Sequence, residues 1–244
     1  MSRTFTIMKR EFGAYFATPV AYVFIVIFLL LTGVFTFYIG GLYERNQADL
    51  EPFFRFHPWL YTLLIPAISM RLWSEERKAG TLELLMTLPV SLVEAVVGKF
   101  LAAWCFTAIA LALTFPMWLT INYLGNPDNT VIAAGYIGSL LLAGGYLAIG
   151  SCISALTKNQ VVAFVISFVI CFAFTLAGFP IVLDLFNTWA PQAIVNVISS
   201  FSFLAHFDSI LKGVIDIRDV IFFGSLIAFW LYANILAIEA KKGS

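Results

Sequence analysis

The side chains that most often carry out catalysis are few in this 244-residue chain, and they lie far apart. Its two histidines are His57 and His206, and its three cysteines are Cys105, Cys152 and Cys171. Each cysteine lies in an apolar run, and their spacing fits neither a metal site nor a disulfide framework. No Ser/His/Asp pattern or carboxylate pair indicates hydrolysis, and no G-x-x-x-x-G-K-S/T motif could hold ATP phosphates. We therefore expect a non-catalytic chain with no cofactor or metal of its own.

Charge is concentrated in the stretch Ser74–Ser91, which reads SEERKAGTLELLMTLPVS. Hydrophobic residues make up 61% of the chain and charged residues 11%, yet five charges fall within nine positions here. They are Glu75, Glu76, Arg77, Lys78 and Glu83. Because charge is costly inside a bilayer, this stretch must lie in water or against a protein partner. The net charge of the whole chain is zero, which leaves no basic face for nucleic acid.

The order of residues in this stretch predicts a short helix between two membrane spans. Gly80 is expected to end the helix that arrives from upstream. Thr81 is a good N-cap for a new helix over residues 82–88, and Pro89 would end that helix. Its apolar face would consist of Leu82, Leu85 and Met86. A capping box formed by Ser91 and Glu94 would then begin the next long helix.

The pattern E-E-R-K-x-G-T-L-E-L-L-x-T-L-P-V-S resembles the segment after the second span of ABC transporter type-2 permeases, the membrane subunits of ATP-driven exporters. In that family the segment is the cytoplasmic coupling helix, which sits in a groove of the ATPase subunit. The resemblance implies that a separate ATPase holds the ATP and Mg. It assigns ATPase coupling to Glu75, Glu76, Arg77, Lys78, Gly80, Thr81, Leu82, Glu83, Leu85 and Met86. A solvated loop is the alternative for such a run of charge.

The fold class expected is all-α: one polytopic permease domain over residues 1–244, with six transmembrane helices. Apolar runs near 20 residues are long enough to cross a bilayer as helices. The expected spans are residues 20–43, 58–73, 96–124, 131–156, 161–183 and 220–238. An amphipathic helix over residues 3–16 would lie in the membrane interface, in contact with lipid. Small residues in the fourth span, such as Gly138 and Gly150, indicate close helix packing.

The positions of lysine and arginine predict the orientation. With both termini and residues 74–91 in the cytoplasm, ten of these residues lie inside and four outside. This asymmetry fits the positive-inside rule. No ionisable residue is expected near the middle of a span. The sequence thus disfavours a secondary transporter, which needs an intramembrane relay.

A second resemblance narrows the branch of the family. The runs S-F-L-A-H-F and G-V-I-D-I-R-D-V near the C-terminus resemble gliding-motility permeases and the permease of nitrous-oxide-reductase maturation. The resemblance implies a bacterial inner membrane and two ATPase copies. It also implies a second permease, either another copy or a homologue, and leaves room for an auxiliary envelope subunit. Export is the leading function. A non-transporting, force-transmitting scaffold of an envelope or gliding machine is the alternative.

The segment 185–217 is expected to form an outer re-entrant gate, covering the outer end of a cavity. Within it, residues 200–213 show helical periodicity, with Phe203 and Phe207 on one face. Asp208 and Lys212, four residues apart on another face, could pair. The gate residues proposed from the sequence are Phe203, His206, Phe207, Asp208 and Lys212. A simple interfacial anchor is the alternative for this segment.

Overall fold

A computed structural model describes residues 3–82, 90–188 and 191–240, and every regular element within these ranges is helical. In chain order they are α1 (Arg3–Phe16), α2 (Pro19–Val34), the π-helical turn η1 (Phe35–Ile39), α3 (Glu51–Arg55), α4 (His57–Ser69), α5 (Arg71–Ala79), α7 (Leu92–Ala112), α8 (Phe115–Leu124), α9 (Asn129–Leu156), α10 (Gln160–Leu176), α11 (Pro180–Asn187), α12 (Gln192–Ser200), α13 (Phe203–Leu211) and α14 (Ile217–Ala240). The all-α prediction is confirmed for this part of the chain.

Side-chain caps begin several of these helices at the positions that the sequence favours. Asp128 Oδ1 accepts the backbone N–H groups of Thr130 and Val131 at the start of α9. Asn159 does the same for α10, and the Ser202 hydroxyl accepts the Ala205 N–H at the start of α13. Each cap satisfies a backbone donor that the first helical turn leaves unpaired.

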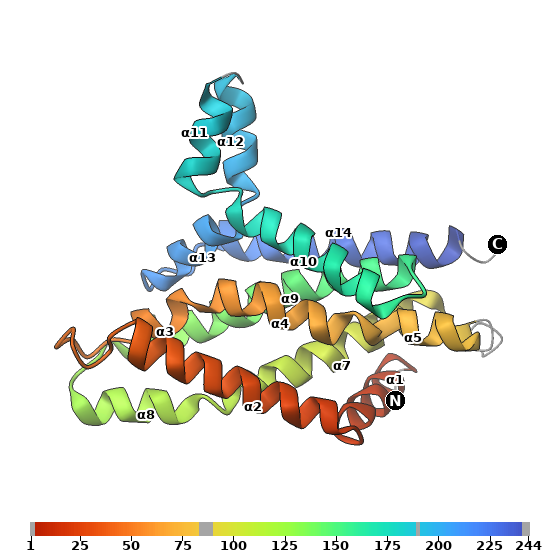
Figure 1. Cartoon of the computed structure of the whole chain (residues 1–244), viewed down its shortest axis with the longest axis horizontal. Helices are drawn as coiled ribbons and strands as arrows, with labels where there is room; N and C mark the ends of the chain where they lie inside the picture. The colour runs from red at the N-terminus through yellow and green to blue at the C-terminus, as the bar shows by residue number, and fades with distance from the viewer. Residues whose placement is uncertain (1–2, 83–89, 189–190, 241–244) are drawn as a thin grey trace.

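Helix α9 is the centre of the bundle, and α4, α5, α7, α10, α13 and α14 all pack against it (Figure 1). It is buried along most of its length. Its glycines permit this close packing. A Cβ atom added to Gly150 would overlap the Ser69 side chain of α4, and one added to Gly135 would come within 2.6 Å of the Phe54 ring. The small residues of the predicted fourth span therefore serve helix packing, as expected.

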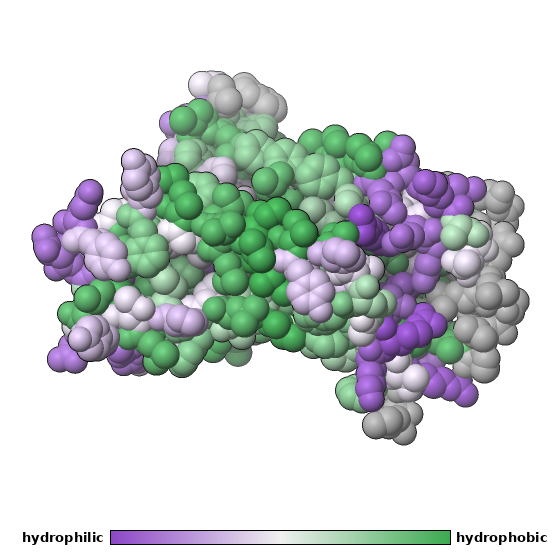
Figure 2. Space-filling model, turned by 60° about the horizontal axis from the view of Figure 1, so that its bottom comes forward, coloured by the Kyte–Doolittle hydropathy of each residue, from purple (hydrophilic) through white to green (hydrophobic). Residues whose placement is uncertain are grey.

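The surface divides into an apolar belt and two polar ends. Figure 2 shows a broad hydrophobic band across the middle of one face, with hydrophilic residues at both ends of the bundle. Four described helical stretches are long and apolar enough to cross a membrane: Pro19–Ile39, Leu92–Leu124, Asn129–Leu156 and Ile217–Ala240. The pair α12–α13, bent by 61°, would make a fifth. The chain is thus a multi-pass membrane protein, and a total of six spans stays a prediction.

Two of the predicted spans are each divided between two helices. The second is divided between α4 and α5 at Met70, one turn after Pro66. The third is divided between α7 and α8 at residues 113–114, just before Pro116. Pro116 explains the break at residues 113–114, because proline has no backbone N–H to donate to the preceding turn. At Met70, the backbone N–H groups of Trp73 and Ser74 donate to the Ser154 hydroxyl of α9 in place of helix carbonyls.

The fifth predicted span, residues 161–183, needs a correction. Helix α10 ends at Leu176, and α11 begins at Pro180 after a turn through Gly178 and Phe179. The outer segment therefore begins before residue 185. Helices α11 and α12 pack against each other as a hairpin that projects sideways from the bundle (Figure 1).

The segment between the first two predicted spans, residues 44–57, is only partly a loop. Its second half forms α3 and the first turn of α4, and Phe53, Phe54 and His57 are fully buried there. Aromatic contacts explain the burial, because the His57 ring stacks on Tyr61 and meets Phe53 edge to face. This segment is therefore part of the packed core.

The polar segments at one end of the bundle come from distant parts of the sequence. Helix α1, the C-terminal end of α5 and the C-terminal end of α14 all lie at the same end in Figure 1. Helix α1 has the predicted bounds and packs along α7, with Ile7 against Gly98 and Tyr15 stacked on Phe106. This packing holds α1 beside the start of the charged stretch.

Candidate coupling site

The charged stretch begins on α5, and its end is defined by Gly80. This residue has φ 71° and ψ 10°, the left-handed conformation that glycine adopts without a steric penalty. The predicted helix end at Gly80 is confirmed. The Thr81 hydroxyl donates to the Glu76 carbonyl at 3.3 Å, so it bonds back to α5. Leu82 packs partly buried against the core.

The middle of the predicted coupling helix lies outside the described residues. Glu83, Leu85, Met86 and the predicted stop at Pro89 belong to this part, and their roles stay predictions. The description resumes at the next helix start. There Ser91 and Glu94 form the predicted capping box, with Glu94 N–H donating to Ser91 Oγ at 3.2 Å and Ser91 N–H to Glu94 Oε2 at 2.9 Å.

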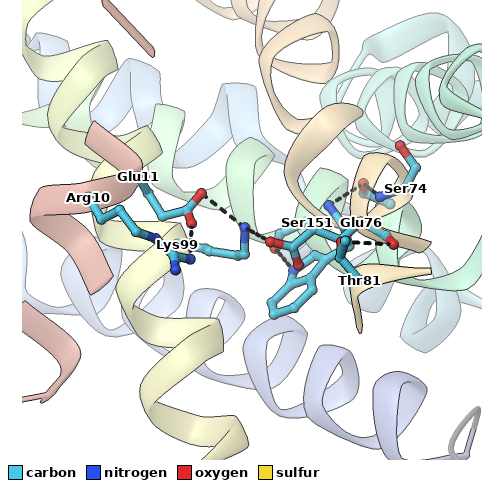
Figure 3. A network of polar contacts seen from close by, with 9 residues as sticks. Arg10, Glu11, Ser74, Glu76, Thr81, Lys99 and Ser151 are labelled. Carbon is cyan, nitrogen blue, oxygen red and sulfur yellow. Dashed lines mark hydrogen bonds and ion pairs between the residues drawn. The ribbon is translucent and has the colours of Figure 1, made fainter. Parts of the chain in front are cut away.

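A buried lysine joins three helices beside this stretch. Lys99 of α7 is 3% exposed, and its ammonium lies 2.9 Å from Glu11 Oε2 of α1 and 2.9 Å from Glu76 Oε1 of α5. Figure 3 shows the lysine extended between the two carboxylates. Its Nζ also lies 5.3 Å from the centroid of the Trp73 ring, a cation–π distance. We call Glu11, Glu76 and Lys99 the inner triad.

The electrostatics of the inner triad favour the ionised form of Glu11. Burial raises the pKa of the Glu11 carboxyl, but Lys99 and Arg10 outweigh it, and the net pKa lies below its ordinary value. Arg10 contributes a hydrogen bond of 2.7 Å to Glu11 Oε1. One lysine charge between two carboxylates is an ion pair network of low exposure, so removing one member leaves uncompensated charge.

A serine cluster on α9 fixes α5 from the other side. The backbone N–H groups of Trp73 and Ser74 both donate to Ser154 Oγ at 3.1 Å, and Ser154 Oγ donates to the Met70 carbonyl at 2.8 Å. These bonds replace part of the backbone ladder where α4 and α5 are interrupted. The Trp73 indole N–H donates to Ser151 Oγ at 3.3 Å.

The same cluster reaches the last helix. Asn234 Nδ2 of α14 donates to Ser151 Oγ at 2.7 Å, and both residues are fully buried. This bond ties α14 directly to α9. Movement of α5 is therefore linked through α9 to α14, and through Lys99 to α1 and α7.

The four charges at the start of the stretch divide into two pairs. Glu75 and Lys78 are exposed and face away from the bundle, where a partner could reach them. Glu76 and Arg77 point inward, since Glu76 belongs to the inner triad and Arg77 Nη1 donates to the Ala155 carbonyl at 2.8 Å. The sequence had assigned all four to contact with an ATPase.

Sequence reasoning missed Glu11 and Lys99 as site residues. Glu11 lies 88 positions before Lys99, so no local spacing pairs them. One signal was present: Lys99 is the single charge of α7 beyond its first turn, and such a charge in an apolar helix usually has a partner. That signal could have identified the lysine but not its two carboxylates.

At the other end, the helix predicted over residues 200–213 is shorter than expected, because α13 spans only Phe203–Leu211, but its buried and charged faces are as predicted. Phe203, Phe207 and Ile210 are fully buried against α9 and its neighbours, while Asp208 and Lys212 are exposed. The predicted pairing of Asp208 with Lys212 does not form an ion pair within 4.0 Å between these two described residues. Gly213 follows with φ 84°, which fits its predicted place at the helix end.

His206 has a partner that the sequence did not suggest. Its Nδ1 lies 2.6 Å from Oδ1 of Asp219, a residue in the first turn of α14. Asp216 caps the start of α14, since its Oδ1 accepts the Arg218 N–H at 2.9 Å. Within the described residues no three His, Cys, Asp or Glu side chains gather in a way that could hold a metal ion.

These observations define a class: a polytopic helical membrane protein whose charged segment between two apolar helices is tied by buried polar contacts to the rest of the bundle. The family description "ABC-2 family transporter protein" matches residues 5–238, nearly the whole chain. The chain belongs to this family and is a membrane permease subunit of an ABC transporter, a class that works with separate ABC ATPase subunits. No individually curated protein matches it significantly.

Proposed function

We propose that this chain is the permease of an ATP-driven exporter and receives the movement of its ATPase through residues 74–91. The observation that carries the proposal is the inner triad. It joins the helix that leads into the charged stretch to α1 and α7, and the serine cluster joins the same helix to α9. A push on this stretch would therefore reach most of the bundle as a rigid displacement.

In this proposal, different residues of the stretch contact the ATPase and attach the stretch to the bundle. Glu75 and Lys78, both exposed, would contact the rim of the ATPase groove, and the apolar face formed by Leu82, Leu85 and Met86 would fill it. Glu76 and Arg77 would instead hold the base of the segment to the bundle. The first pair would thus govern association and the second pair transmission.

Two ATPases and two permeases would form the complex, in which ATP and Mg are bound by the ATPase subunits. The second permease would be another copy of this chain or a homologue. Both termini and the coupling segment would lie in the cytoplasm, a proposal supported by the lysine and arginine asymmetry. This orientation is supported by the gathering of α1, α5 and the end of α14 at one end of the bundle (Figure 1). Helix α13, with Phe203, His206 and Phe207, would then close the outer end.

Leu85→Asp tests the coupling role. The substitution places a carboxylate in a groove that expects an apolar side chain, at a cost of several kcal/mol, on the order of 2–7. Tagged permease purified in mild detergent should carry an ABC ATPase, identified by its nucleotide-binding sequence. Leu85→Asp should lose it while remaining inserted, and Leu85→Met, which conserves volume, should keep it. Retention of the ATPase by Leu85→Asp would remove residues 74–91 from the coupling role.

A further inference from the structure

The junction between α12, α13 and α14 holds a histidine in an arrangement that the proposed function does not use. His206 of α13 is partly buried, with 21% of its side chain exposed. Its ring stacks on Phe222 of α14, with centroids 3.9 Å apart and planes at 17°. Both ring nitrogens make hydrogen bonds, one to α14 and one to the last residue of α12.

Both partners of the imidazole are oxygen acceptors. Nδ1 lies 2.6 Å from the Asp219 carboxylate, and Nε2 lies 3.0 Å from the Ser200 carbonyl. A carbonyl oxygen cannot donate, and an ionised carboxylate cannot donate either. A neutral imidazole has a single N–H, so it cannot bond both acceptors at once.

The geometry therefore fixes the number of protons on the pair. Either His206 carries two N–H hydrogens beside an ionised Asp219, or a neutral His206 accepts a hydrogen from a protonated Asp219. Both arrangements contain two hydrogens between the imidazole and the carboxyl, one more than neutral histidine with ionised aspartate. We propose that this pair is a proton-dependent lock that sets the position of the α11–α12 hairpin.

The lock acts at the base of the hairpin, where Phe201 also meets Phe174 and Phe179 meets Trp59 edge to face. Ser200 ends α12, and the α12–α13 pair bends by 61° across residues 201–202. The imidazole spans this bend. A second contact lies nearby, where Gly178 approaches the Ser202 side chain so closely that an added Cβ would overlap it. Beyond these points the hairpin projects from the bundle (Figure 1), so its tilt depends on how its base is held.

Loss of one proton breaks one of the two bonds. A bare ring nitrogen would then face an oxygen acceptor at a hydrogen-bond distance, with no hydrogen between them. Asp219 is 4% exposed, and its second oxygen, Oδ2, is buried without a hydrogen-bond partner, so water does not compensate readily. The Ser200 contact is the easier one to release, because the hairpin beyond it can move.

The other charged groups described near the junction do not form hydrogen bonds to the imidazole in place of Asp219. Asp208 and Lys212 of α13 are exposed, and Asp216 and Arg218 lie at the start of α14. Among the described residues, Asp219 is the one charged group in hydrogen-bond contact with the imidazole. Histidine is the side chain type that most often gains or loses a proton between about pH 5 and about pH 8, so the test compares these two pH values.

The test measures the hairpin position in the full chain reconstituted in lipid nanodiscs, without an ATPase. Spin labels are placed at Asn196 of α12 and Tyr123 at the end of α8, both exposed, after Cys105, Cys152 and Cys171 are replaced by alanine. The distance distribution is recorded at about pH 5 and about pH 8. We expect one narrow peak at the lower pH and loss of that peak at the higher pH.

Two variants separate the lock from a general effect of pH. Asp219→Asn supplies an amide that donates to Nδ1, which leaves a neutral His206 free to donate to Ser200. Its narrow peak should therefore persist at both pH values. His206→Phe keeps the ring stacked on Phe222 but removes both bonds, so its distribution should be broad at both. Asp216→Asn, a carboxylate of the same junction outside the lock, should behave as the unmodified chain.

Three outcomes would overturn the lock: an unmodified chain whose distance distribution is the same at both pH values, an Asp219→Asn variant that still responds to pH, or a His206→Phe variant that keeps the narrow peak. The measurement uses the chain alone. Failure to bind an ATPase would therefore leave it unaffected, and failure of the lock would leave ATPase coupling untouched.

Discussion

The charged stretch at one end of the bundle and the α11–α12 hairpin at the other are held by different kinds of polar contact. At one end, Lys99 joins Glu11 and Glu76 in a buried ion network beside the charged stretch. At the other, His206 joins Ser200 and Asp219 at the base of a projecting hairpin. Lysine keeps its charge throughout the physiological range, whereas histidine changes charge within it. The first junction is suited to constant transmission and the second to regulation.

The packing behind the two junctions is the same. Both segments rest on α9, whose serines and glycines let α5 approach at one end and α13 at the other. What differs is therefore the polar contact and not the core. Changes to the core should affect both ends as a loss of folded protein, while changes to each polar group should affect one end.

The largest effect is expected from a substitution in the core beside the His206 junction. Phe207→Asp removes a fully buried ring and inserts a carboxylate without a partner. The lost packing alone costs about 3–5 kcal/mol, and the buried charge adds to it. The yield of folded, monodisperse protein in detergent should fall sharply. The double variant Asp208→Asn, Lys212→Gln changes two exposed charges of the same helix and should stay within about 0.5 kcal/mol of the unmodified chain.

If the double variant proved the more damaging, α13 would present its charged face to the interior. Phe207 would then be exposed, and not buried, in the protein within a membrane. This comparison also distinguishes a packed gate helix from an interfacial anchor, because an anchor would tolerate Phe207→Asp by turning the carboxylate towards water.

The next largest effect is expected from Lys99→Met in the inner triad. The substitution conserves length and leaves Glu11 and Glu76 without their shared cation, at a cost of about 3–5 kcal/mol. Thermal unfolding followed by fluorescence should show a lower midpoint. Adding Glu11→Gln and Glu76→Gln to Lys99→Met removes the uncompensated charges and should restore most of the midpoint.

The triple variant separates stability from transmission. If the inner triad transmits movement, the restored protein should still bind the ATPase but fail to stimulate ATP hydrolysis. Full stimulation by the triple variant would limit the triad to a structural role.

The sequence predicted the local features of both ends well. Gly80, the Ser91–Glu94 box and the two faces of α13 all depend on neighbours within four residues, and each is confirmed. The polar junctions depend on pairs such as Glu11 with Lys99, which no local pattern connects. The fifth span was drawn too long because the apolar run continues past Gly178, although the turn at Phe179–Pro180 ends the helix. Hydropathy indicates where a chain can be buried, but not where its helix stops.

A smaller effect compares two adjacent carboxylates on α5. Glu76→Gln weakens the contact with buried Lys99 and should lower the unfolding midpoint by the equivalent of about 1–2 kcal/mol. Glu75→Gln removes an exposed charge and should stay within about 0.5 kcal/mol. For ATPase affinity measured by titration, Glu75→Gln should have the larger effect of the two, because Glu75 faces outward. Equal effects on stability would contradict the inward position of Glu76.

The smallest effect is the acid response of the inner junction. Glu11 has a folded-state pKa below its ordinary value of 4.5, so its ion pair adds stability above that pH. This stability is lost as pH falls through the folded pKa, because the carboxyl takes up a proton and releases Lys99. The carboxylate is partly exposed, so we expect ~0–1 kcal/mol. Unfolding midpoints measured from about pH 6 to about pH 3 should fall less steeply for Glu11→Gln than for the unmodified chain. His206→Phe should leave that difference unchanged, because the outer lock is expected to lose its proton only as pH rises.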